Sequence, residues 1–221
     1  KHIHSDKGQH RQEFIARSGM PRSDMSQFPD DPHKIRERIR RYENSLRKEF
    51  KMFDYISDGY GKRYLIGPMY LLVGDTAGAV KYFEWYEQQF PDDIGEPFHW
   101  LCWALALYQA NDRENAARKL HRAMLSNLYL LPCLLGIEQP VLELRHGSNW
   151  EEKEYVEEGP VELLQLWDEQ ALAWAKELYQ SEGFQKVRER SIELQRRLST
   201  EPVGPQRSKW VQEWFDLRHL R

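Results

Sequence analysis

The chain has 221 residues, of which 40% are hydrophobic, 13% aromatic and 30% charged, and its formal net charge is −3. That length suits one globular domain or a short helical array, and the aromatic content, with eight Trp, can supply a sizeable core. A near-neutral total gives no general attraction to nucleic acid or to membranes. Apolar runs stay below the roughly 18 residues that a membrane-spanning helix needs. Two cysteines, Cys102 and Cys133, cannot form a disulfide framework, so we expect a cytoplasmic protein.

The charges are distributed unevenly along the chain. Residues 1–50 carry 12 Lys or Arg against 8 Asp or Glu, whereas residues 151–200 carry 7 against 12. Residues 1–30 have too few apolar side chains to offset the entropy of ordering and are predicted to form a flexible arm. The ordered part is predicted to be a helical domain over 31–199, followed by a linker and a C-terminal capping helix over 200–221.

A long amphipathic helix is predicted to begin at Asp31 and Pro32. Asp is a good helix cap, and Pro suits the first helical position because its missing N–H would have no partner there. The apolar residues that follow recur at spacings of three, four and seven, namely Ile35, Ile39, Tyr42, Leu46, Phe53 and Ile56. They form one stripe along a helix, and we expect this stripe to be packed.

The other faces of this helix are basic over residues 34–48. Acids alternate with the bases, and two pairs, Glu37 with Arg41 and Glu43 with Arg47, have the spacing of favourable ion pairs on a helix surface. We therefore interpret the basic run as a solvated helix face. A nucleic-acid-binding surface, which would not need matched acids, is the alternative.

Two helical hairpins are predicted from an internal repeat, over about 60–91 and 97–127. Small, aromatic and Pro residues mark the first copy at fixed intervals: Gly67, Tyr70, Ala79, Phe83 and Pro91. A shift of 37 residues aligns a second set with the first, namely Ala104, Asn111, Asp112, Ala116 and Leu120. The small residues would let two antiparallel helices approach closely, with the aromatic residues filling the space between them.

The spacing of these residues resembles that of the tetratricopeptide repeat (TPR), a helix–turn–helix unit of about 34 residues. The order of segments 63–67 (RYLIG), 73–75 (VGD) and 126–136 is also similar to that in a group of bacterial and plant TPR proteins and, more distantly, in the suppression-of-tumorigenicity family. The resemblance covers about residues 55–180. It implies an all-α, TPR-like array of antiparallel hairpins with an interaction role and no catalytic residue.

In the repeat family, the groove lined by the first helix of each hairpin binds the partner. Transferring those positions gives eight apolar or aromatic candidates: Tyr64, Pro68, Leu71, Leu72, Phe98, Leu101, Leu105 and Tyr108. Repeat proteins that clamp a terminal carboxylate use Lys, Arg and Asn there, so no carboxylate clamp is expected in this groove. An amphipathic helix would fit it, from a partner or from the chain's own residues 32–58, and we favour the chain's own helix.

The C-terminal third is predicted to continue in helices. A buried helix is expected from Gly159 and Pro160 to near Gly183, followed by an amphipathic helix. A short, very apolar helix comes after Pro205, with Trp210, Trp214 and Phe215 among its residues. We interpret this last helix as a cap on the array, with a docking peptide as the alternative.

Motifs for catalysis are missing from the sequence. It has no phosphate-binding glycine loop, no paired-His zinc motif and no nucleophile turn, and Glu96 is interpreted as an acid that stabilises a helix N-terminus. No cofactor, metal ion or membrane partner is expected. The predicted function is a non-catalytic module or scaffold that binds another protein or a second copy of itself. The alternatives are a nucleic-acid-associated factor that uses residues 34–48, and an enzyme whose site is not visible as a motif.

Overall fold

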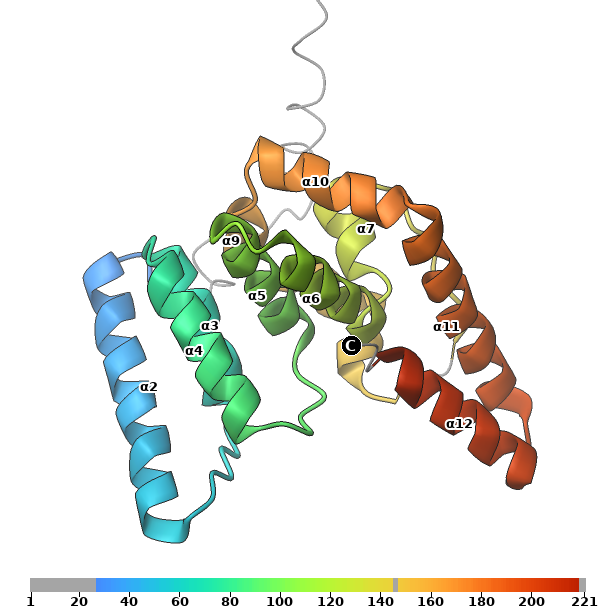
Figure 1. Ribbon diagram of the computed structural model, residues 1–221, viewed down its shortest axis with the longest axis horizontal. Helices are drawn as coiled ribbons and strands as arrows, with labels where there is room; N and C mark the ends of the chain where they lie inside the picture. The colour runs from blue at the N-terminus through green and yellow to red at the C-terminus, as the bar shows by residue number, and fades with distance from the viewer. Residues whose placement is uncertain (1–26, 145–146, 219–221) are drawn as a thin grey trace, which may run out of the picture.

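The computed structural model describes residues 27–144 and 147–218, and every regular element in this part of the chain is a helix. The all-α prediction is therefore confirmed. The predicted arm, 1–30, lies outside the described residues except for 27–30. The first half of the array in Figure 1 consists of α2 (Pro32–Phe53), α3 (Lys62–Leu72), α4 (Thr76–Gln89), α5 (Pro97–Gln109) and α6 (Arg113–Ser126).

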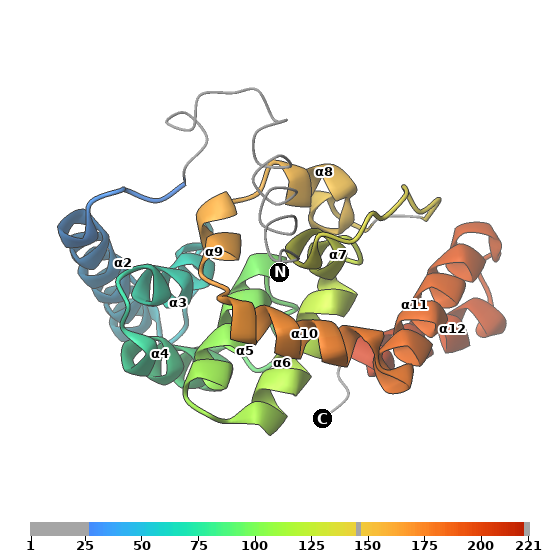
Figure 2. The ribbon, with the colours of Figure 1, turned by 90° about the horizontal axis from the view of Figure 1, so that it is seen from above.

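The second half returns across the first and then extends away from it (Figures 1 and 2). Its longer helices are α10 (Glu169–Gln180), α11 (Glu182–Thr200) and α12 (Pro205–Arg218). Short elements precede them, namely α7 (Leu130–Leu135), η1 (Asn149–Glu151), α8 (Lys153–Glu157) and α9 (Val161–Gln165). None of the described helices combines the length and the apolar character needed to span a bilayer.

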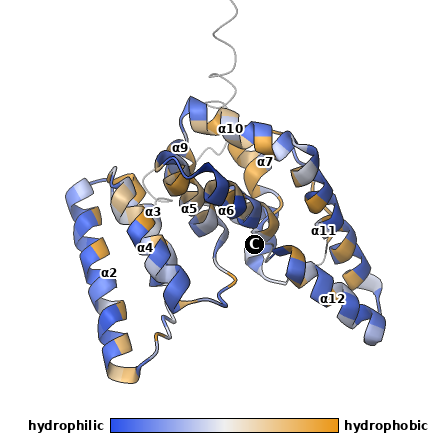
Figure 3. Cartoon of the chain, viewed as in Figure 1, coloured by the Kyte–Doolittle hydropathy of each residue, from blue (hydrophilic) through white to orange (hydrophobic). Residues whose placement is uncertain are grey.

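Helix α2 begins as its cap residue predicts. The Asp31 carboxylate accepts a hydrogen bond from the His33 N–H at 2.9 Å, and Pro32 is the first helical residue. The N-terminal part of the apolar stripe is buried where α2 packs against α3. Phe53, which we assigned to the same stripe, is instead 58% exposed, because the last turn of α2 extends beyond α3 (Figure 1). That end of α2 is coloured as hydrophobic in Figure 3.

The two hairpins, α3–α4 and α5–α6, are joined by turns of the same conformation. Gly74 and Asn111 both have a left-handed backbone, with φ of 73° and 64°. The residue that follows each of them, Asp75 or Asp112, caps the next helix by accepting a backbone N–H bond at 2.8 or 3.2 Å. The repeated Asp explains why both second helices start immediately after the turn.

The core is centred on α5, which lies between α3, α4 and α6 (Figure 2). Eleven of its 13 residues are buried. Within the first hairpin, α3 approaches α4 closely at Gly67, where a Cβ atom would lie 2.4 Å from the Phe83 ring. A small residue at this position is therefore a steric requirement of the hairpin.

The C-terminal region differs from the predicted single helix over 160–183. The structure divides it into α9 and α10, because Asp168 starts a new helix by accepting the Ala171 N–H at 2.8 Å. Helix α12 lies along α11 and reaches α6 at its C-terminal end, yet none of its residues is fully buried. Its aromatic face is therefore only partly covered.

Candidate binding surface

The eight residues predicted to line a groove lie on α3 and α5. Leu72 and Tyr108 are half-buried, and the other six are buried: Tyr64, Pro68, Leu71, Phe98, Leu101 and Leu105. The buried ones of these side chains belong to the core and offer no exposed surface to a partner.

Aromatic side chains from residues 149–174 pack on three of the predicted groove residues. The Trp150 ring meets Tyr64 edge-on with ring centres 5.5 Å apart, and Trp174 lies 4.7 Å from Tyr108. Tyr155 of α8 contacts Phe98 at 6.0 Å. We expected residues 32–58 to fill the groove. Helix α2 packs against α3, and three large aromatic side chains of the later segment pack on Tyr64, Phe98 and Tyr108.

A buried polar cluster lies beside these predicted groove residues. Arg63 Nε is 2.6 Å from Asp93 Oδ2, and the Tyr64 hydroxyl donates to Asp93 Oδ1 at 2.8 Å. Burial raises the pKa of Asp93, but hydrogen bonds from the Gly95 N–H, Tyr64 and Arg63 lower it overall. Asp58 also accepts from Arg63, so the cluster ties two loops to α3. Its polar groups are mutually paired, as in a structural network.

His99 is the buried residue that most resembles a catalytic group, but its surroundings favour a structural role. It is fully buried among aromatic rings, and burial lowers its pKa to about 3. Nδ1 lies 3.3 Å from the Tyr64 carbonyl oxygen, and Nε2 has no hydrogen-bond partner. A neutral imidazole without exposed atoms cannot reach a substrate. Over 27–144 and 147–218, no three or more His, Cys, Asp or Glu side chains are grouped to hold a metal ion.

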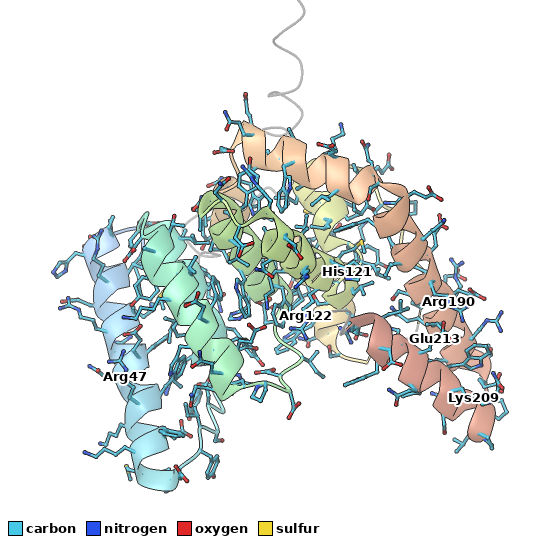
Figure 4. All side chains as sticks on the ribbon, viewed as in Figure 1. Arg47, His121, Arg122, Arg190, Lys209 and Glu213 are labelled. Carbon is cyan, nitrogen blue, oxygen red and sulfur yellow. The ribbon has the colours of Figure 1, made fainter. Side chains whose placement is uncertain are left out.

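A cleft that the repeat pattern did not indicate lies between α12 and the α5–α6 hairpin. Its volume is about 50 Å³. In Figure 4, Arg122 lies on the side of α6 that faces α12. We call this site the tryptophan–arginine cleft, and its lining residues are Ile94, Trp100, Arg122, Ser126, Trp214, Phe215 and Arg218.

The α4–α5 loop forms one wall of the tryptophan–arginine cleft. Gly95 has a left-handed φ of 74°, and a Cβ atom there would lie 2.2 Å from the Trp100 indole. This close approach lets the Trp100 indole N–H donate to the Ile94 carbonyl oxygen at 2.9 Å. The loop is therefore held against Trp100 while the Ile94 side chain stays 60% exposed.

Two guanidinium groups lie over the two indoles of the cleft. Arg122 is 4.5 Å from the centre of the Trp100 ring, and Arg218 is 4.4 Å from that of Trp214. Arg122 Nε donates to the Arg218 carbonyl oxygen at 3.4 Å, which joins α6 to the end of α12. Burial lowers the pKa of both arginines, because it disfavours their charged forms.

The sequence offered little signal for this cleft. Arg122 and Arg218 are 96 positions apart. We had assigned Trp214 and Phe215 to a capping helix, and the density of aromatic residues in that helix was the one usable indication of a binding role. Comparisons with protein families, with curated proteins and with solved structures found no match to this chain.

Proposed function

We propose that this protein is a non-catalytic interaction module that binds another protein through the tryptophan–arginine cleft. The observation that carries the proposal is the composition of the cleft, whose lining includes two Trp, two Arg and the exposed side chains of Ile94 and Phe215. Trp and Arg are enriched among the residues that dominate binding energy at protein interfaces, and such residues lie in pockets surrounded by other contacts.

The size of the cleft favours a protein partner over a small molecule. Sites for drug-sized ligands enclose about 300–1,000 Å³. A volume of about 50 Å³ is far smaller and accepts the end of one side chain. The surrounding surface of α12 extends the contact, since Val211, one turn before Phe215, is also exposed.

The rest of the fold suits a scaffold. The two hairpins repeat the same turn and cap, which supports a TPR-like arrangement. Proteins of this kind present binding surfaces on a rigid stack of helices. Because aromatic side chains from residues 149–174 pack on three of the predicted groove residues, we place the binding surface on the face formed with α12.

Site-specific photo-crosslinking in cells tests this function. A photoreactive amino acid in place of Phe215 should give one dominant crosslinked protein, and a second substitution, Ile94→Ala, should weaken that crosslink. The matched control places the same group at Val203, which is 96% exposed and outside the cleft. Equal crosslinking from both positions, or none from position 215, contradicts the proposal.

A second candidate function is nucleic-acid binding by α2. Among the described residues, Arg36, Lys48 and Lys51 have no carboxylate within ion-pair distance. Of the two predicted pairs, Glu43 and Arg47 form an ion pair at 3.3 Å. Glu37 instead lies 3.8 Å from His33. The helix thus carries more unmatched basic charge than its sequence pattern indicated.

Charge reversal on α2 distinguishes the two functions. The variant Arg40→Glu, Arg41→Glu, Arg47→Glu should leave the crosslink from position 215 unchanged, because these residues are not in the cleft. Fluorescence anisotropy with a short single-stranded RNA should show no RNA binding by the original protein or by the triple variant. RNA binding that the triple variant abolishes would favour the nucleic-acid function.

A further inference from the structure

We infer that the tryptophan–arginine cleft binds the side-chain carboxylate of an Asp or Glu residue of the partner, against the guanidinium of Arg122. This inference rests on the proposed function, since it names the chemical group that the cleft recognises. None of the eight predicted groove residues is cationic, whereas the lining of this cleft includes two arginines.

The first argument is charge balance. Arg218 Nη1 lies 3.5 Å from Glu151 Oε1, so its charge is partly matched. Arg122 has no carboxylate within ion-pair distance among the described residues, and only its Nε has a hydrogen-bond acceptor. Within ion-pair distance in the described part of the chain, the two arginines have one carboxylate, that of Glu151, which leaves one positive charge in excess. Glu87 acts on Arg122 only from a longer distance. Burial disfavours that charge, and an incoming carboxylate would compensate it through charge-assisted hydrogen bonds.

The second argument is an unsatisfied donor on Trp214, which is one of the residues that line the cleft. Its indole Nε1–H is buried and has no hydrogen-bond partner among residues 27–144 and 147–218. Buried donors without a partner are uncommon in folded proteins. The positive edge of this indole adds to the field of the two guanidinium groups, so the wall favours an anion over a neutral or cationic group.

Size and charge favour a carboxylate over a phosphate. A cavity needs about 10–15 Å³ to hold one water molecule, so a cleft of about 50 Å³ has room for only a small group. A carboxylate with its neighbouring methylene has this size, and Ile94 and Phe215 offer apolar contacts to the methylene. A phosphate carries up to two negative charges, which exceed the single positive charge in excess.

Nuclear magnetic resonance of the full chain with ¹⁵N-labelled Trp indoles tests the inference. At constant ionic strength, sodium acetate should shift the Trp214 and Trp100 indole signals saturably, whereas neutral acetamide should not. Arg122→Gln should weaken acetate binding by about tenfold or more. The matched control is Arg118→Gln on the same helix, because Arg118 pairs with Glu114 at 2.6 Å and does not line the cleft.

Three results would overturn the carboxylate assignment. They are equal shifts with acetamide, unchanged acetate binding in an Arg122→Gln protein that keeps its thermal midpoint, and tighter binding of inorganic phosphate than of acetate. The crosslinking experiment separates this inference from the proposed function. If position 215 gives the crosslink but acetate does not bind, the carboxylate inference is rejected and the proposed function stands. If acetate binds but the crosslink is missing, the proposed function is rejected and the carboxylate inference stands.

Discussion

Gly67 determines how closely α3 packs on α4. Because an added Cβ would lie 2.4 Å from the Phe83 ring, Gly67→Ala should lower the free energy of unfolding by about 1–3 kcal/mol through overpacking. Gly183→Ala is the control, since no atom lies within 4 Å of its added Cβ. Alanine is the better helix former, so the control should be neutral or stabilising by up to about 1 kcal/mol. Urea unfolding measures both, and equal effects would contradict the packing argument.

His99 should make the stability of the protein depend on pH. Burial lowers its pKa to about 3, well below the roughly 6.5 of an unfolded chain. Between these values the unfolded chain binds one more proton than the folded protein. The stability that the neutral His99 provides is therefore complete above about pH 6.5 and is lost as the pH falls toward 3.

The variant His99→Phe tests this linkage by removing the titrating group while keeping an aromatic ring. The unfolding free energy of both proteins is measured with urea from pH 7 to below pH 5. As the pH falls, that of the variant should decrease less steeply, and the two slopes should differ by about 1.4 kcal/mol per pH unit. His121, whose pKa burial lowers to about 4, is present in both proteins, so its contribution cancels. Identical slopes would show that His99 takes up a proton in the folded state.

At the scale of elements, the Glu96 carboxylate connects α5 to α8. It accepts hydrogen bonds from the Phe98 and His99 N–H groups at 2.9 and 2.7 Å, and from the Tyr155 hydroxyl at 2.6 Å. Burial raises the pKa of Glu96, and these three donors oppose the rise. The helix cap predicted from the sequence is thus also the anchor of the segment that packs on the predicted groove residues.

Tyr155→Phe should therefore weaken the attachment of α8 to α5. Loss of a hydrogen bond to a buried charged group costs about 1.5–3 kcal/mol of unfolding free energy. Tyr60→Phe is the control, because Tyr60 is 89% exposed. Thermal or urea unfolding should show a loss for Tyr155→Phe and no change for Tyr60→Phe. A neutral Tyr155→Phe variant would mean that the Glu96 carboxylate needs only its backbone donors.

Across the whole molecule, stability should decrease from the centre of the array toward α12. Helix α5 has eleven buried residues, whereas α12 has none. Regions with few buried contacts open at low free energy. In native-state hydrogen exchange followed by mass spectrometry, amides of α12 should exchange well before those of α5. Equal protection of the two helices would show that α12 unfolds only with the core.

The local features of the fold were predictable because each depends on residues a few positions apart. Asp31 caps α2 and Glu96 caps α5, as their positions before apolar helical segments indicated. Asp168 was missed, since the apolar residues on both sides of it suggested one continuous helix. The eight groove residues were predicted to bind a partner, but their spacing could not show that Trp150, Tyr155 and Trp174 pack on three of them.

The sequence by itself determined the helical class, the caps and the close packing at Gly67, because helix formation and hairpin turns depend on neighbouring residues. Only the tertiary structure decided which apolar face is covered and which remains open. It also decided that Arg122 lies beside Trp100 and the end of α12, with no carboxylate within ion-pair distance in the part of the chain that the structure describes. The burial of a side chain and the balance of charges around it depend on residues that are far apart in the chain. The spacing of neighbouring residues therefore cannot predict them.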